Sequence, residues 1–559
     1  MTRKTPPTRT LRQHPDLDQL KRQARELLEA FTASEPNAVA EVHAYYRGAD
    51  PASFALHEAQ LVLARAYGFD SWPKLKSFVD GVTVTRLGEA VRAGDVAQVR
   101  AMLKARPELV NLDMAENDEH RALHYAVLQR SPEMVRVLMD HGADARIGIY
   151  PHRDATQALT IATERGYAEI VEIIHEEEAR RRPSGPTTPT LSPAPTEGVP
   201  GSEPTPRWAI ATGNVDWLRA RHAESRLRNP ADGDGLMTTA VMANRPEVVA
   251  LLLELGFDPN ERTRIENLEE VVYSWGAPLQ HCAGSGELAM AEMLLARGAD
   301  PNGQIYASGT PVSSAYRARD AAMLALLERH GGVVAASTAG YHRDTDLARR
   351  MLAAESAGVL PSGAVSPGKT VVEELLDGDC GDPEIIRMAL EHIDWPRDDP
   401  RWYPILGGPL AFWNHIPWIQ STLWPFDRTT YVECFRLILQ RCHANLSGSF
   451  GRTILHDVVA MGRRDGVRDW VTEDEVLAFA TTLLDAGARL DVRDDLLKST
   501  PLGWACRWGR VTLVNLMLER DADPVETNAE PWATPTAWAT SRHNDEVLAA
   551  LRAHGRSHS

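Results

Sequence analysis

The sequence predicts an all-α protein in which short helix-turn-helix units stack side by side into a solenoid. The first observation is a phrase with four copies, RALHYAV, APLQHCAGSG, RTILHDVVAMG and TPLGWACRWG, which begin at Arg121, Ala277, Arg452 and Thr500. The second is a shorter phrase, such as DHGADA or ARGADPN, about 20 residues after several copies. The third is a repeat period near 33 residues, which is typical of small units that bury their apolar faces only by stacking.

Composition narrows the class of protein further. The chain has 559 residues, 43% of them apolar, which is enough for a large buried core. Its formal net charge of −17 argues against a general nucleic-acid or anionic-membrane surface. Neither a signal peptide nor an apolar run of about 18 residues is found, which predicts no membrane partner. The five cysteines show no CxxC spacing, so we expect buried free thiols and a cytoplasmic location.

The N-terminal 81 residues differ from the repeats. Residues 1–13 are rich in Thr, Pro and Arg, and we expect a basic disordered tail, or alternatively a basic docking arm. Residues 14–81 show helical periodicity, with Leu20, Ala24 and Leu27 on one face of the first helix. They predict a small helical domain that precedes the array.

Composition divides the rest of the chain into five parts. Residues 85–182 and 207–394 read as two repeat blocks, the second of them degenerate after residue 340. Between them, 183–206 is a Pro/Thr/Ser-rich linker or surface loop. A Trp/Pro-rich insertion at 395–427 precedes the C-terminal repeats at 428–556. The sequence leaves open whether the linker separates two rigid blocks or loops out of one solenoid.

The recurring phrases have a direct physical interpretation. Thr500 can cap the first helix of its unit, and Pro501 presets the first turn. Gly509 can end that helix, and Leu513 belongs to the second helix of the unit. In the shorter phrase, Gly298 begins a tight turn after the second helix, and a short projecting hairpin follows.

These phrases resemble the ankyrin repeat, whose family pattern is TPLHxAxxxG followed by GADxN. The resemblance covers roughly 85–182 and 207–556, and the N-terminal helices also resemble those of a class of bacterial ankyrin proteins without a defined activity. It implies an ankyrin solenoid that binds a protein or peptide in its concave groove. It also implies that His124 and His456, at the family's His position, make structural hydrogen bonds.

The position two residues after the repeat's Leu faces the groove in ankyrin arrays. Here it holds Tyr125, Thr239, His281, Asp457, Trp504 and Trp538. Trp508 follows Trp504 by one helical turn, with Arg507 beside it. Tryptophan and arginine are typical of binding hot spots, so we expect Trp504, Arg507, Trp508 and Trp538 to anchor a partner. The alternative is that a neighbouring segment covers them as core. A secondary surface is expected at the hairpin tips, with Tyr150, His152, Arg153, Tyr273, Trp275, Tyr306 and Trp532.

The segment 394–428 holds five of the chain's 14 tryptophans and six prolines. We expect its prolines to break helices, so that it is not an ordinary repeat. Because it is too apolar for a linker, it must pack against something. It plugs the array's own groove, walls a ligand pocket, or forms a platform for a partner. The pocket would be lined by Trp402, Tyr403, Trp413, His415, Asp457 and Arg507. The second possibility makes the chain a small-molecule binder or an enzyme.

Motifs for catalysis are missing. HEAQL at His57 lacks the second histidine of HExxH, and the glycines at 232–235 lack the Lys-Ser/Thr of a phosphate loop. No GxSxG occurs, and no Cys/His cluster has metal-ligand spacing. The sequence therefore predicts no catalytic residue, no metal site and no cofactor. A protein-binding scaffold is the leading hypothesis, ahead of the small-molecule alternative and of a purely structural spacer.

Overall fold

The computed structural model is almost entirely helical. It describes residues 9, 16–46, 49–69, 71–113, 120–149, 153–181, 205–229, 235–264, 269, 273–305, 309–377, 380–415, 427–462 and 471–557. Within these residues the only strands are β1 (Thr263–Arg264) and β2 (Tyr273–Ser274), which pair antiparallel in a short hairpin.

Four helices form the N-terminal unit. They are α1 (Leu17–Thr32), α2 (Pro36–Tyr45), α3 (Leu56–Ala66) and α4 (Trp72–Val79). Asp16 begins α1 because its carboxylate accepts a hydrogen bond from the backbone N–H of Asp18, 2.9 Å away. The apolar side chains of this unit form two small cores of their own, in which Phe31 and Phe54 meet edge to face at 4.7 Å.

The first block of repeats consists of helix pairs joined by tight turns. Its elements are α5 (Val84–Arg92), α6 (Val96–Ala105), the 3-10 helix η1 (Pro107–Val110), α7 (Ala122–Leu128), α8 (Pro132–Asp140), α9 (Arg153–Thr156), α10 (Ala158–Glu164) and α11 (Ala168–Arg181). The turns that follow α5, α7 and α10 contain Gly94, Arg130 and Gly166, all at positive φ, a conformation that favours glycine. We call α5–α11 the first block.

The histidines of the repeat phrase tie each unit to its hairpin. His124 Nδ1 accepts from the backbone N–H of Arg121 at 3.1 Å, and its Nε2 lies 2.9 Å from the carbonyl oxygen of Ile147. His456 makes the equivalent contacts, with the N–H of Thr453 and with the carbonyl oxygen of Ser499. Both rings are buried, and they make the structural hydrogen bonds that the family resemblance implies.

The remaining repeats form one longer series of helix pairs, which we call the long array. Its first part comprises α12 (Pro206–Ala211), α13 (Val215–Ala223), α14 (Leu236–Met242), α15 (Pro246–Glu254), α16 (Ala277–Ser285), α17 (Leu288–Leu295), α18 (Pro311–Arg317), α19 (Ala321–Arg329), α20 (Ser337–His342), α21 (Thr345–Ser356), α22 (Val371–Asp377) and α23 (Pro383–Glu391). Its second part comprises α24 (Trp402–Gly407), the 3-10 helix η2 (Gly408–His415), α26 (Thr430–Leu439), the 3-10 turn η3 (Ser449–Gly451), α27 (Ile454–Ala460), α28 (Glu473–Asp485), α29 (Pro501–Trp508), α30 (Val511–Glu519), α31 (Pro535–Ser541) and α32 (Asp545–Ser557).

The Trp/Pro-rich insertion contributes a helix, and the expectation that its prolines would break helices is wrong for 402–407. Pro404 lies in the first turn of α24, where no intrahelical N–H bond is lost. This helix packs against α22 and α27, in the layer of short inner helices. Trp402 is fully buried, and its indole N–H donates to the carbonyl oxygen of Pro396 at 2.9 Å. The described part of the insertion therefore belongs to the core of the array.

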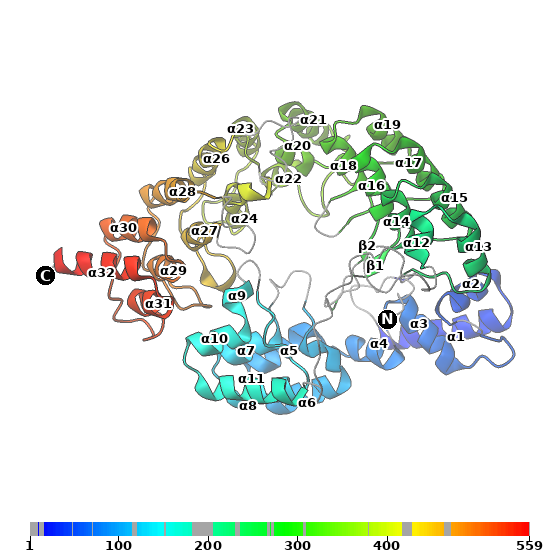
Figure 1. Ribbon diagram of the computed structural model, residues 1–559, viewed down its shortest axis with the longest axis horizontal. Helices are drawn as coiled ribbons and strands as arrows, with labels where there is room; N and C mark the ends of the chain where they lie inside the picture. Colours follow the sequence, from blue (N-terminus) through cyan, green and yellow to red (C-terminus); the bar gives the residue numbers. More distant parts are fainter. Residues whose placement is uncertain are drawn as a thin grey trace.

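The described chain closes into a ring (Figure 1). Helices α12–α32 follow a curve, and the first block lies across its open side. The apolar core of the first block is separate from the core of α12–α19, but it includes Leu496 from the hairpin before α29. The first block therefore does not simply continue into the stack of helix pairs that begins at α12. It packs against the far end of the long array instead.

Candidate protein-binding groove

Six inner helices carry a side chain at one equivalent position. After each of these helices the chain turns at a residue whose φ is positive, between 49° and 76°. The equivalent position lies five residues before that turn residue. The residues at the position are Tyr125, Trp208, Thr239, His281, Trp504 and Trp538. The short inner helices that carry it line the inside of the ring (Figure 1).

At the C-terminal end the two tryptophans of this series are buried. Trp504 and Trp538 are each 1% exposed. The indole N–H of Trp504 donates to Asp494 Oδ1 at 2.9 Å, and that of Trp538 donates to Ser499 Oγ at 2.7 Å. The His456 ring packs edge to face on Trp504, with the centroids 5.3 Å apart. Both indoles act as core groups with satisfied donors, and a partner has no access to them in this conformation.

Arg507 is the most unusual charged residue of this region. The residue is 3% exposed, and the guanidinium carbon lies 4.6 Å from the Trp508 ring centroid and 5.1 Å from that of Trp538. The Nη2 group donates to both carboxylate oxygens of Glu164, at 2.8 and 3.0 Å. Burial lowers the pKa of Arg507, and the Glu164 charge acts against that shift. A buried arginine of the long array is thus neutralised by a glutamate of the first block.

Further contacts join the first block to the same end of the array. Arg542, at the end of α31, forms a second ion pair with Glu164. Arg165 donates to the carbonyl oxygen of Leu496, and its guanidinium lies 4.5 Å from the Trp532 ring centroid. Nearby, the rings of His120 and Phe450 stack at 3.6 Å. The first block therefore covers the end of the array at which the sequence predicts the binding anchors.

A second junction closes the other side of the ring, and it depends on Glu269 from the segment between β1 and β2. Its carboxylate accepts from the backbone N–H of Val84 at 2.7 Å and from Arg106 Nη1 at 2.6 Å. Its own N–H donates to the carbonyl oxygen of Asp113 at 2.7 Å. Glu269 and Arg106 are both buried. This glutamate supplies a negative charge at the N-terminus of α5, where the helix dipole favours it.

The inner helices α12, α14 and α16 carry exposed groups instead. Trp208 is 43% exposed, Met242 is 59% exposed, and His281 is exposed as well. Met242 lies two residues before Asn244, as Arg507 lies two residues before Gly509, so it has the equivalent place on its helix. The sequence analysis did not select Trp208 or Met242. The signal for Trp208 was its position in WAIATG, five residues before Gly213.

The other predicted binding residues lie apart from these groups. Tyr125 is half-buried, with the Arg92 guanidinium 4.8 Å from its ring centroid. Asp457 accepts a hydrogen bond from the Tyr403 hydroxyl and lies 3.8 Å from Arg452 Nη1. The side chains of Trp413 and His415 lie outside the described residues, as do those of Tyr150, His152, Tyr273 and Tyr306.

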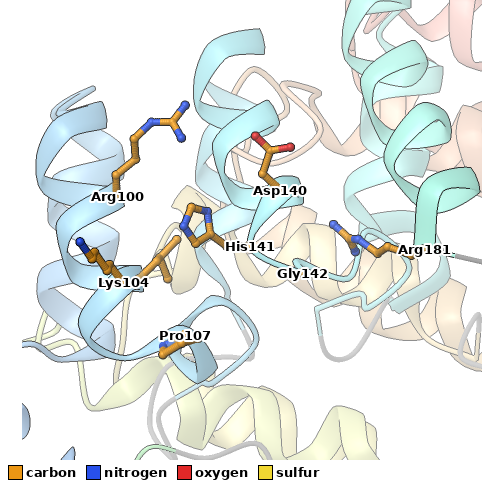
Figure 2. Close-up of a pocket in the computed structure, with 8 residues that line it drawn as sticks. Arg100, Lys104, Pro107, Asp140, His141, Gly142 and Arg181 are labelled. Carbon is orange, nitrogen blue, oxygen red and sulfur yellow. The ribbon is translucent and has the colours of Figure 1, made fainter. Parts of the chain in front are cut away.

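An open hollow of about 670 Å³ lies at the ends of α6 and α8 in the first block (Figure 2). Arg100 and Lys104 come from α6, and His141 and Gly142 follow α8. Arg181 enters from α11 and donates to the carbonyl oxygen of Met139 in the last turn of α8, and to that of Ala143 at 2.7 Å, so this cation satisfies the end of a helix. None of the predicted binding residues lines this hollow.

The described residues hold no group of three or more His, Cys, Asp or Glu placed to bind a metal ion. All five cysteines are free and buried, and burial raises the pKa of Cys282 and of Cys442 to about 12. Such thiols are not poised for nucleophilic chemistry. Among the helices described, none combines the length and the apolar character that crossing a bilayer requires.

Comparison with known proteins agrees with the architecture. The family model described as ankyrin repeats (3 copies) matches residues 87–183, which span most of the first block. No curated protein matches the chain. The helix pairs of the long array have the same plan, with short inner helices and residues of positive φ in the turns. Residues 87–183 therefore contain ankyrin repeats, and the long array repeats their helix-pair plan.

Proposed function

We propose that this protein is a cytoplasmic scaffold that captures a protein or peptide segment on the concave side of its long array. Ankyrin repeats are in general protein-interaction modules, which supports the class of function. The observation that carries the proposal is the exposure of Trp208 and Met242 on the neighbouring inner helices α12 and α14. Large apolar side chains exposed on neighbouring helices are typical of interaction sites.

The chemistry of these groups suits a peptide. A half-exposed indole offers a broad, rigid surface, and tryptophan is enriched among the residues that dominate binding energy. The flexible thioether of Met242 can adapt to different side chains. Burying such a side chain fully stabilises a complex by about 1.5–3 kcal/mol. Thr239 and His281 lie at the series position on α14 and α16 and add polar contacts beside the apolar pair.

The C-terminal anchors form the second part of the proposed surface. Trp504, Arg507, Trp508 and Trp538 lie at or near the series position, and in the closed ring Arg507 is paired with Glu164 of the first block. A partner therefore meets the α12–α16 surface first and reaches Arg507 only when Glu164 has moved away.

The alternative, a small-molecule site between the insertion and the C-terminal repeats, has less support. Trp402 is a core residue, and Asp457 already accepts from the Tyr403 hydroxyl. The hollow detected at α6 and α8 is far in sequence from these residues. We therefore place the protein-binding function first.

A displayed peptide library tests the proposal. Peptides are selected on the immobilised full-length chain, and their dissociation constants are measured by fluorescence anisotropy. For selected peptides we expect the double variant Trp208→Ala/Met242→Ala to weaken binding at least tenfold, since two apolar contacts are lost.

The matched control removes exposed apolar groups elsewhere. Val359 and Val525 are exposed and lie outside the inner helices, so Val359→Ala/Val525→Ala leaves binding unchanged. Equal affinities for wild type and the Trp208/Met242 variant, across all selected peptides, contradict the proposed surface.

A further inference from the structure

Glu164 occupies the C-terminal groove as a ligand would. It lies two residues before Gly166 at the end of α10, and Arg507 lies two residues before Gly509 at the end of α29. The two side chains thus hold equivalent places on inner helices 343 residues apart in the sequence. At this point of the ring, the end of an inner helix of the first block meets the end of an inner helix of the long array.

The pocket around Arg507 is built by the long array itself. Trp508 and Trp538 hold the guanidinium between their rings, at 4.6 and 5.1 Å from the centroids. The Asn544 side chain donates to the carbonyl oxygen of Cys506 at 2.8 Å, which fixes the end of α29. No part of this frame comes from the first block, so the arginine stays oriented when Glu164 leaves.

Positive charge exceeds negative charge at this junction. Arg507 and Arg542 pair with the same Glu164 carboxylate, and Arg165 lies beside it in the sequence. The nearby Asp494 accepts from the Trp504 indole at 2.9 Å and from the backbone N–H of Leu497 at 2.6 Å. One hydrogen-bond donor of the pocket, Arg507 Nε, is buried without a partner among the described residues. A carboxylate placed to accept from Arg507 Nε as well would therefore form one hydrogen bond more than Glu164 does.

We propose that Arg507 and Arg542, walled by Trp508 and Trp538, form a carboxylate-binding site that Glu164 occupies in cis. An acidic side chain of a partner protein takes the place of Glu164 and releases the first block from this end of the array. The net charge of the chain is −17, so its surface as a whole repels acidic segments. The basic pocket attracts them locally, which makes it a specific site for an acidic side chain. This inference rests on the proposed function, whose C-terminal anchors it explains.

A peptide that presents the natural cis ligand tests the site. The probe is a fluorescein-labelled peptide of residues 157–170, QALTIATERGYAEI, which contains Glu164. Its binding is measured by anisotropy on the full-length wild type, on Glu164→Gln and on Glu164→Gln/Arg542→Gln. Gln keeps the shape of the side chain and removes its charge, so the protein variant is expected to fold.

We expect Glu164→Gln to bind the probe at least tenfold more tightly than wild type does, because the competing cis carboxylate is gone. We expect no such gain in affinity for a probe with Gln in place of Glu164. We also expect none when the probe is measured on Glu164→Gln/Arg542→Gln. Arg542 is 38% exposed at its side chain, so its replacement leaves the core intact. Thermal unfolding of each variant identifies any that has not folded.

The outcomes separate this inference from the proposed function. Equal probe affinity for wild type and Glu164→Gln, or equal binding of the Glu and Gln probes, overturns the carboxylate site. If the binding of the library peptides still depends on Trp208 and Met242, the proposed function stands without the carboxylate site. If the probe binds as expected while no library peptide depends on the concave surface, the carboxylate site stands and the proposed function falls.

Discussion

One glutamate lies at each of the two junctions that close the ring. Glu269 joins the hairpin of the long array to α5, and Glu164 joins α10 to α29 and α31. Sequence reasoning singled out Arg507 and the tryptophans around it, since they stand at the repeat's variable positions. It did not find Glu164 or Glu269, because a glutamate in a repeat or a hairpin is ordinary, and contacts between residues more than 150 apart leave no local pattern.

We expect Glu269→Gln to lower the free energy of unfolding by about 2–4 kcal/mol, because the buried Arg106 loses its shorter, buried ion pair and keeps only the 3.3 Å contact with Glu108. Chemical denaturation followed by circular dichroism measures this change. The control is Asp491→Asn, which breaks an exposed ion pair with Arg489 and has little effect. An equal, small effect of both changes contradicts the role given to Glu269.

At the scale of elements, periodicity and capping residues were sufficient to predict the helix pairs. They failed at 402–407, where a proline in the first turn was compatible with a helix that completes the inner layer. The burial of Trp504 and Trp538 also lay beyond sequence pattern. Their indole partners Asp494 and Ser499 come from the adjoining hairpin, whose fold a helical repeat pattern does not specify.

The junction of α18 and α20 is a seam between the two cores of the long array. Val334 packs against both cores, and the Tyr316 hydroxyl donates to Asp344 across the seam. The His342 ring lies 5.6 Å from the Tyr316 ring. Burial, together with the charges of Arg317 and Arg319, lowers the pKa of His342 to about 4, from 6.5. Asp344 acts in the opposite direction.

This shift predicts a loss of stability in mild acid. Between pH 6.5 and about 4 the unfolded chain binds a proton at His342 and the folded chain does not. The free energy of unfolding therefore falls as the pH falls, by up to about 1.4 kcal/mol per pH unit from this group. Denaturation at a series of pH values measures the slope.

The variant His342→Gln removes this titration, and we expect a shallower slope between pH 6.5 and 4. His281→Gln is the matched control, since that side chain is exposed. The same slope in wild type and His342→Gln contradicts the buried, neutral histidine at the seam.

At the scale of the whole molecule, the ring determines what a partner can reach. Trp208 and Met242 are exposed, whereas Arg507 is buried and paired with Glu164 of the first block. The sequence left open how 183–206 relates the two sets of repeats, because the composition of a connecting segment does not reveal how the elements it joins are arranged. In the structure the first block has its own core and meets the far end of the long array.

The closed ring is tested most directly by the distance between Glu169 and Glu546. Both residues are exposed, and they lie five and four positions from Glu164 and Arg542, the two sides of the C-terminal junction. Spin labels on Glu169→Cys and Glu546→Cys report their separation by double electron–electron resonance, with the five native cysteines buried and unlabelled. A single short and narrow distance distribution, which broadens and lengthens in Glu164→Gln, is the result that we predict. A long or broad distribution in the wild-type background contradicts the closed ring.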